Sequence, residues 1–71
     1  MNMQNYYVVC SYMVQDYKTK HNEYRFESEI LTGDPDDMEN TILKWNTYFK
    51  DKIEDGFGDI KYLTIVNWKA V

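Results

Sequence analysis

The segment Tyr6–Tyr17, YYVVCSYMVQDY, decides the fold of this 71-residue chain. Side chains alternate between the two faces of a strand, and here both faces are largely apolar. One face carries Tyr6, Val8, Cys10, Tyr12 and Val14, and the other carries Tyr7, Val9, Ser11, Met13 and Gln15. A strand that is buried on both faces has this pattern, whereas an edge strand with one wet face does not. We therefore expect this segment to be the central strand of a small sheet.

The segment Glu23–Leu31 predicts a second strand with one apolar and one charged face. The apolar side holds Tyr24, Phe26, Ser28 and Ile30, and the charged side holds Glu23, Arg25, Glu27 and Glu29. The polar residues between the two strands fit a hairpin loop. Joining the two apolar faces predicts the antiparallel pairs Val14–Tyr24, Tyr12–Phe26, Cys10–Ser28 and Val8–Ile30. A slip of one residue would turn the glutamates toward the buried face.

The run Asp34-Pro35-Asp36-Asp37 predicts the start of a helix. Asp34 can cap the free backbone N–H groups, and Pro35 suits the first helical position. The two aspartates that follow favour the positive end of the helix dipole. An apolar stripe at helical spacing comes next, formed by Met38, Ile42, Trp45, Phe49 and Ile53. Leu43 falls outside this stripe, and Gly56 is expected to end the helix.

The segment Asp59–Lys69 predicts the third strand. A helix between the second and third strands brings the third back parallel to the second. The third strand can then lie beside the first and antiparallel to it. The expected fold class is α+β, with the element order ββαβ. It is a three-stranded antiparallel sheet of order 2-1-3 with one helix packed on one face. A single domain over residues 1–71 accounts for a chain of this length.

Composition limits the classes of function. The net charge is −4, whereas a generic nucleic-acid binder is normally basic. One cysteine excludes an internal disulfide. The first residues do not form a signal peptide, and no apolar run approaches the roughly 18 residues of a membrane span. We therefore expect a cytoplasmic protein that does not bind a membrane.

No group of residues predicts catalysis or metal binding. His21 lies in the expected hairpin loop, and Cys10 lies on the core side, away from the polar setting that a nucleophile needs. The acids around Asp34 do not have EF-hand spacing, which requires Gly where this chain has Glu39. We expect no enzymatic activity, no cofactor and no metal.

Two surface features remain as candidate binding sites. The first is an acidic segment with no base, expected to dock on a basic surface of a host protein. It comprises Glu27, Glu29, Asp34, Asp36, Asp37 and Glu39. The second is an apolar patch on the face of the sheet away from the helix, expected to join a homodimer or to bind a required partner. It comprises Tyr7, Val9, Met13, Leu63 and Ile65.

An alternative site lies at the expected hairpin tip, where basic and aromatic residues could bind single-stranded nucleic acid by charge and stacking. Its members are Lys18, Lys20, Arg25, Tyr17 and Tyr24. The net charge and the glutamates of the second strand oppose this alternative.

The opening strand NYYVVCSY, the capped helix and the closing strand IVNWKAV resemble a class of small uncharacterised proteins carried by bacteriophages and prophages. The resemblance covers most of the chain. It implies an accessory protein that acts by binding, without catalytic residues. Small acidic phage proteins include inhibitors of host nucleic-acid-handling machinery, anti-CRISPR proteins among them, which is an analogy of size and charge. The leading interpretation is therefore a non-enzymatic protein-binding module, and single-stranded nucleic-acid binding is the alternative.

Overall fold

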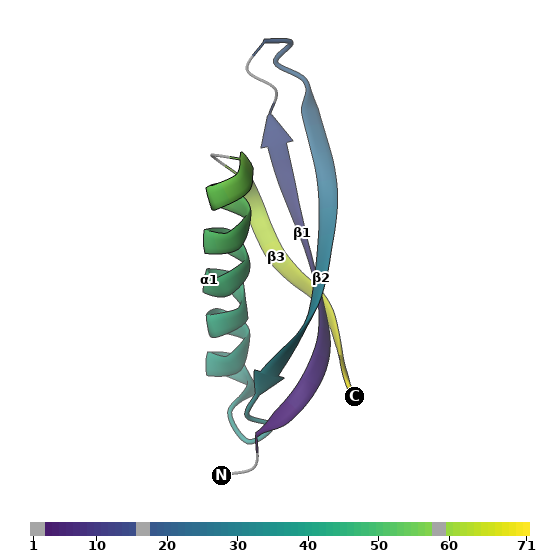
Figure 1. The fold of residues 1–71 in the computed structure, drawn as a ribbon, viewed down its shortest axis with the longest axis vertical. Coiled ribbons are helices and arrows are strands. Elements are labelled where there is room, and N and C mark those ends of the chain that lie inside the picture. The colour runs from purple at the N-terminus through teal and green to yellow at the C-terminus, as the bar shows by residue number, and fades with distance from the viewer. Residues whose placement is uncertain (1–2, 16–17, 58–59) are drawn as a thin grey trace.

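The structure is a computed structural model that describes residues 3–15, 18–57 and 60–71. It contains three strands and one helix, which are β1 (Gln4–Gln15), β2 (Asn22–Gly33), α1 (Met38–Phe57) and β3 (Ile60–Ala70). The sheet has the order β2-β1-β3 with both pairs antiparallel, and α1 lies against one of its faces (Figure 1). The α+β class and the ββαβ order predicted from the sequence are confirmed. The hairpin of β1 and β2 extends past the C-terminal end of the helix (Figure 1).

The core forms between β1 and α1. Its buried side chains are Tyr6, Val8, Cys10, Tyr12, Trp45, Phe49 and Ile53. These residues alternate along β1 and recur every three to four residues along α1, as the two periodicities require. The predicted helical stripe is therefore confirmed, with Met38 and Ile42 partly buried at its N-terminal end. Leu43 lies outside it with 57% of its surface exposed.

The register predicted for β1 and β2 is wrong by one residue. The observed pairs are Val14–Glu23, Tyr12–Arg25, Cys10–Glu27 and Val8–Glu29. The charged side of β2 therefore shares the helix side of the sheet with the core residues of β1. Its apolar side lies on the opposite face, where Tyr24 and Phe26 are each 69% exposed and Ile30 is 59% exposed.

The position of α1 explains this register. From β3, three side chains pack against the core (Ile60, Leu63 and Ile65), whereas Leu31 is the one partly buried hydrophobic of β2 that does so. The apolar stripe of the helix thus lies over β1 and β3. The helix side of β2 meets the polar flank of α1, where Tyr48 and Lys52 both contact Glu29. Glutamates suit that side, because Glu29 accepts from these two helix residues and Glu27 accepts from the Tyr12 hydroxyl of β1.

Strand β3 is irregular where it pairs with β1. The register shifts between Val9 and Cys10 and again between Ser11 and Met13 of β1. Tyr62, at the second shift, has a φ of 58°. Register shifts of this kind mark β-bulges, in which an extra residue on one strand increases the local twist and disrupts the ladder of hydrogen bonds. The bulged edge of β3 contrasts with β2, whose register with β1 is continuous from Asn22 to Gly33.

The helix begins later than predicted. The Asp37 N–H donates to the Asp34 carbonyl at 3.0 Å, and the Asp36 N–H donates to Asp34 Oδ1 at 2.9 Å. Residues 34–37 therefore form a turn with Pro35 at its second position, where proline is favoured. The first helical bond runs from the Thr41 N–H to the Asp37 carbonyl at 3.1 Å, so Asp37 is the N-cap in place of Asp34. At the other end the helix continues through Phe57, past the expected stop at Gly56.

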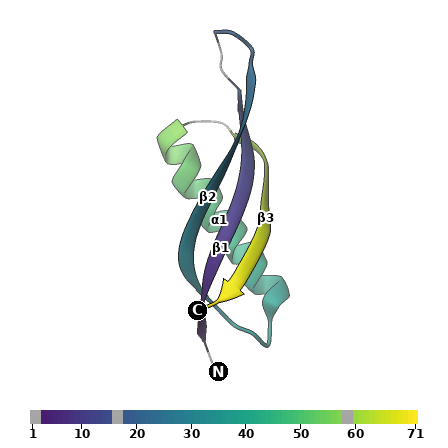
Figure 2. The same ribbon diagram turned by 90° about the vertical axis from the view of Figure 1, so that its right-hand side faces the viewer.

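The face of the sheet opposite α1 is not covered by any element that the structure describes (Figure 2). We call it the open face and define it by the side chains that alternate onto it. They are Asn5, Tyr7, Val9, Ser11, Met13 and Gln15 of β1, Asn22, Tyr24, Phe26, Ser28, Ile30 and Thr32 of β2, and Lys61, Thr64, Asn67 and Lys69 of β3. The structure has principal extents of 48 × 17 × 17 Å, so this face is long and narrow.

Candidate functional site

The six residues of the predicted acidic site do not form one surface. Glu27 and Glu29 lie on the helix side of β2, partly buried, and Asp34 is partly buried in the turn that follows β2, while Asp36, Asp37 and Glu39 are exposed at the N-terminal end of α1. The two groups come from separate elements and point to different surroundings. The local reason is the β2 register, which turned the glutamates toward the helix.

Glu29 is held by two donors from α1. Lys52 Nζ donates to Glu29 Oε2 at 2.8 Å, and the Tyr48 hydroxyl donates to the same oxygen at 2.7 Å. These hydrogen bonds, the one from Lys52 first, lower the pKa of Glu29 below its ordinary value. The hydrogen bond to Glu29 in turn raises the pKa of Lys52 and that of Tyr48. This carboxylate is therefore used to attach β2 to the helix.

Glu27 and Cys10 lie beside each other in the register, next to Tyr12. The Tyr12 hydroxyl donates to Glu27 Oε1 at 3.4 Å. Burial, followed by the charge of Glu27, raises the pKa of Tyr12, and burial raises the pKa of the Cys10 thiol. Cys10 is thus packed in the core, as the sequence predicted.

The exposed acids at the start of α1 serve the turn and the helix. Asp34 accepts the Asp36 N–H, and Asp37 Oδ2 accepts from Asn40 Nδ2 at 2.9 Å. Acids at this end also interact favourably with the helix dipole. Asp36, Asp37 and Glu39 nonetheless remain exposed, and they are the part of the predicted acidic site that is free to face another molecule.

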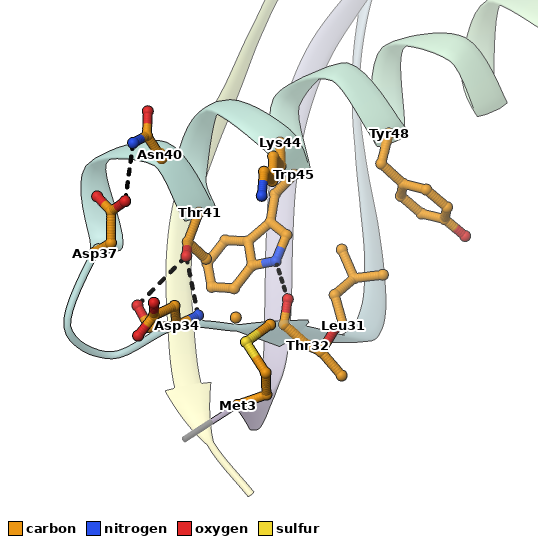
Figure 3. A pocket seen from close by; sticks show the side chains of 11 residues that line it. Met3, Leu31, Thr32, Asp34, Asp37, Asn40, Thr41, Lys44, Trp45 and Tyr48 are labelled. Carbon is orange, nitrogen blue, oxygen red and sulfur yellow. Dashed lines mark hydrogen bonds between the residues drawn. The ribbon is translucent and has the colours of Figure 1, made fainter. Parts of the chain in front are cut away.

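A pocket of about 400 Å³ lies beside these acids, between the first turns of α1 and the end of β2 (Figure 3). The Trp45 indole is part of its lining and donates from Nε1 to the Thr32 carbonyl at 2.9 Å. Thr41 Oγ1 accepts the Asp34 N–H at 3.0 Å. These two hydrogen bonds connect the end of β2 to α1 and use the polar groups of the pocket. The pocket is therefore part of the contact between strand and helix, and we place no ligand in it.

The basic and aromatic residues of the alternative site do not converge. Tyr24 projects onto the open face, whereas Arg25 lies on the helix side and pairs with Glu23 at 3.1 Å. Lys18 and Lys20 belong to the hairpin loop, and Tyr17 lies outside the described residues. Adjacent residues of one strand point to opposite faces, which separates Tyr24 from Arg25.

The predicted apolar patch is corrected in two of its five members. Leu63 and Ile65 lie on the helix side and pack against the core, because the register shifts in β3 change which of its residues face the helix. Tyr7 and Val9 lie on the open face as predicted. Met13 also lies on that side but is buried, with Tyr24 and Lys61 as its neighbours in the register.

The open face instead takes its exposed apolar side chains from β2. Tyr24, Phe26 and Ile30 join Tyr7 there. The sequence marked the three β2 residues as one apolar face but assigned them to the core. The two-sided apolar pattern of β1 shows that β2 could join its apolar side to either face of the sheet. The sequence contains no signal that decides between the two faces, because the choice depends on where the helix and β3 lie.

Within the described ranges, no group of three or more His, Cys, Asp or Glu side chains could hold a metal ion. His21 lies in the hairpin loop, where its backbone N–H donates to Thr19 Oγ1 at 3.2 Å. Among the residues that the structure describes, no helix has the length and apolar character needed to cross a membrane.

No protein-family model, no curated protein and no solved structure matches this chain.

Proposed function

We propose that this chain is a small, non-enzymatic binding module that docks its partner through the open face of its sheet. The observation that carries the proposal is the exposure of Tyr24, Phe26 and Ile30 on one side of an edge strand. Several exposed large apolar side chains on one face, bordered by polar residues, are typical of an interaction site.

The composition of the open face supports the proposal. Tyr, Phe and Met are enriched at the centres of binding interfaces, where charged residues are depleted. Here the aromatic side chains belong to β1 and β2, and the lysines lie on β3, at the rim. A standard interface buries roughly 800 Å² on each partner. The molecule is 48 Å long and 17 Å across, and the strands that carry the open face run along its long axis.

A matched pair of variants tests this proposal. Ile30→Lys places a charge on the open face, and Leu43→Lys places the same charge on the outer side of α1, at 59% and 57% exposure in the parent. Immobilised parent protein in a bacterial lysate should retain a partner, either protein or nucleic acid, that Ile30→Lys loses and Leu43→Lys keeps. Equal retention by all three proteins would refute the proposal.

The acidic end of α1 supports a second candidate, an inhibitor that docks on a basic surface of a host nucleic-acid-handling protein. Its specific support is the exposure of Asp36, Asp37 and Glu39 at one end of the molecule. Opposite charges would speed the encounter and make binding sensitive to salt. Reversal of all three residues to Lys should then abolish capture of that protein while Ile30→Lys leaves it intact.

A further inference from the structure

Charge is distributed unevenly between the two sides of this acidic protein. The chain carries 12 Asp and Glu against 8 Lys and Arg. Among the strand residues that the structure describes, the acids of β2 lie on the helix side, and none of the side chains that define the open face is acidic. The charged groups of the open face are Lys61 and Lys69. The charged side chains that define the face are therefore basic, on a molecule whose net charge is −4.

Aromatic rings lie across the open face from these lysines. Tyr24 and Phe26 are two residues apart on β2, so their positions are separated by roughly 6–7 Å along the strand. Each is 69% exposed, and Tyr7 adds a third, partly exposed ring on β1. Exposed rings on a sheet are a platform on which any base can stack, because every base has a flat π-face.

We propose that the open face binds single-stranded nucleic acid, with bases stacked on Tyr24, Phe26 and Tyr7 and phosphates near Lys61 and Lys69. The proposal rests on the proposed function and names the ligand class of the same face. Ser11, Ser28, Thr64 and Asn67 lie among the rings and lysines in the register and supply hydrogen-bond donors and acceptors for the base edges. Sheets that present aromatic side chains in this way bind RNA in other folds.

Charge complementarity favours this ligand over a second copy of the chain. Two open faces packed together would bring four lysines into the interface and no carboxylate to neutralise them, since the acids of β2 point to the other side. Unpaired charges at an interface are costly to desolvate. A single-stranded nucleic acid can neutralise the lysines with its phosphates and cover the rings with its bases.

The test is fluorescence anisotropy with labelled oligo(dT) and oligo(rU) of about twelve nucleotides, a length within the range bound by single sheet-based modules. Two phosphate contacts predict a slope of log K against log salt of about −1.4, or about sevenfold weaker binding between about 50 and 200 mM salt. Phe26→Ala should weaken binding roughly 5- to 150-fold, the range of one stacked base. Lys69→Ala should reduce the slope to about −0.7.

Controls separate the possible outcomes. Leu43→Ala, on the outer side of α1, should leave oligonucleotide binding unchanged, and each variant is first checked for a parent-like unfolding transition. Absence of binding at low salt, or binding that Tyr24→Ala and Phe26→Ala do not weaken, overturns the proposal. Loss of binding only in Lys18→Ala and Lys20→Ala would also overturn it, by assigning the ligand to the hairpin tip.

The ligand class and the binding face can fail separately. If Ile30→Lys loses a lysate protein while the parent retains no oligonucleotide, the proposed function stands and nucleic acid is the wrong ligand. A parent that sediments as a dimer, with Phe26→Lys a monomer, would make a second copy the occupant and overturn the proposal. If the open-face variants bind the same lysate protein and oligonucleotide as the parent and have the same oligomeric state, both proposals fail together.

Discussion

Gly33 lies where β2 comes closest to the helix. A Cβ atom at this position would be 2.5 Å from Thr41 Cγ2 and 2.9 Å from a ring carbon of Trp45. Both neighbours are buried and each makes a hydrogen bond to the chain between Thr32 and Asp34, so neither can move away freely. The glycine is thus needed for the close approach of strand and helix.

We predict that Gly33→Ala destabilises the protein by about 1–3 kcal/mol, the usual cost of overpacking a tight site. Urea denaturation monitored by tryptophan fluorescence measures the change in the free energy of unfolding. Ser28→Ala, at an exposed position of the same strand, is the control and should stay within about 0.5 kcal/mol of the parent. A Gly33→Ala variant as stable as the parent would mean that the two elements are farther apart.

Trp45 is the residue of α1 that connects the helix to all three strands at one end of the sheet. Its ring lies 5.4 Å from that of Tyr6 and 6.3 Å from that of Trp68, centroid to centroid. Its Nε1 also donates to the Thr32 carbonyl at 2.9 Å. One side chain therefore contacts all three strands.

We predict that Trp45→Ala costs about 3–5 kcal/mol of stability, enough to unfold much of so small a domain. Leu43→Ala, on the exposed side of the same helix, should cost less than about 1 kcal/mol. Thermal unfolding monitored by circular dichroism would show the difference in midpoint. Equal losses at the two positions would show that the helix presents another side to the sheet.

The contact between β2 and α1 depends on pH through Glu29. Its folded pKa is lowered by the hydrogen bonds from Lys52 and Tyr48. A lowered folded pKa contributes stability that is fully present above the unfolded pKa of a glutamate, about 4.3, and is lost as pH falls through the folded value. The contribution is small, because the pair is partly exposed to solvent.

We predict that Glu29→Gln is less stable than the parent near neutral pH and that the difference shrinks as pH falls below about 4. Urea denaturation across this pH range measures it. Asp51→Asn, at an exposed position of α1, is the control for a general loss of negative charge. A difference that stays constant with pH would contradict the assignment to the charged form of Glu29.

The register of β1 and β2 determines the two surfaces of the whole molecule. In the observed register Phe26 is exposed and Ile65 packs against the core; the sequence predicted the reverse for both. Phe26→Lys should therefore cost less than about 1 kcal/mol, as exposed substitutions do. Ile65→Lys should cost about 2 kcal/mol or more, because it brings a charge to the apolar layer.

Unfolding curves of these two variants decide between the registers. Sedimentation of the wild type adds a second measurement, the oligomeric state. If the chain forms a homodimer through the open face, Phe26→Lys should be a monomer, whereas Leu43→Lys, on the outer surface of the helix, should remain a dimer. If Phe26→Lys unfolds the chain and Ile65→Lys does not, the glutamates of β2 face away from the helix and the open face described here does not exist.

The local pattern of the sequence determined the elements of this protein. The strand patterns of Tyr6–Tyr17, Glu23–Leu31 and Asp59–Lys69, the spacing of Trp45, Phe49 and Ile53, and the break at Asp34–Asp37 were sufficient to predict three strands, one helix and their order. These signals are local because strand and helix periods are properties of neighbouring residues. The helix phase and the exposure of Leu43 follow from the same periods.

Only the tertiary structure decided which face of β2 is covered. The central strand β1 is apolar on both faces, so β2 could join its apolar side to either one, and the hydrophobic pattern permits both registers. The choice depends on where the helix lies across the sheet. Because α1 packs over β1 and β3 and offers Lys52 and Tyr48 to Glu29, the glutamates turn toward it and the rings of Tyr24 and Phe26 face outward. The open face, and with it the proposed binding site, is a consequence of that packing.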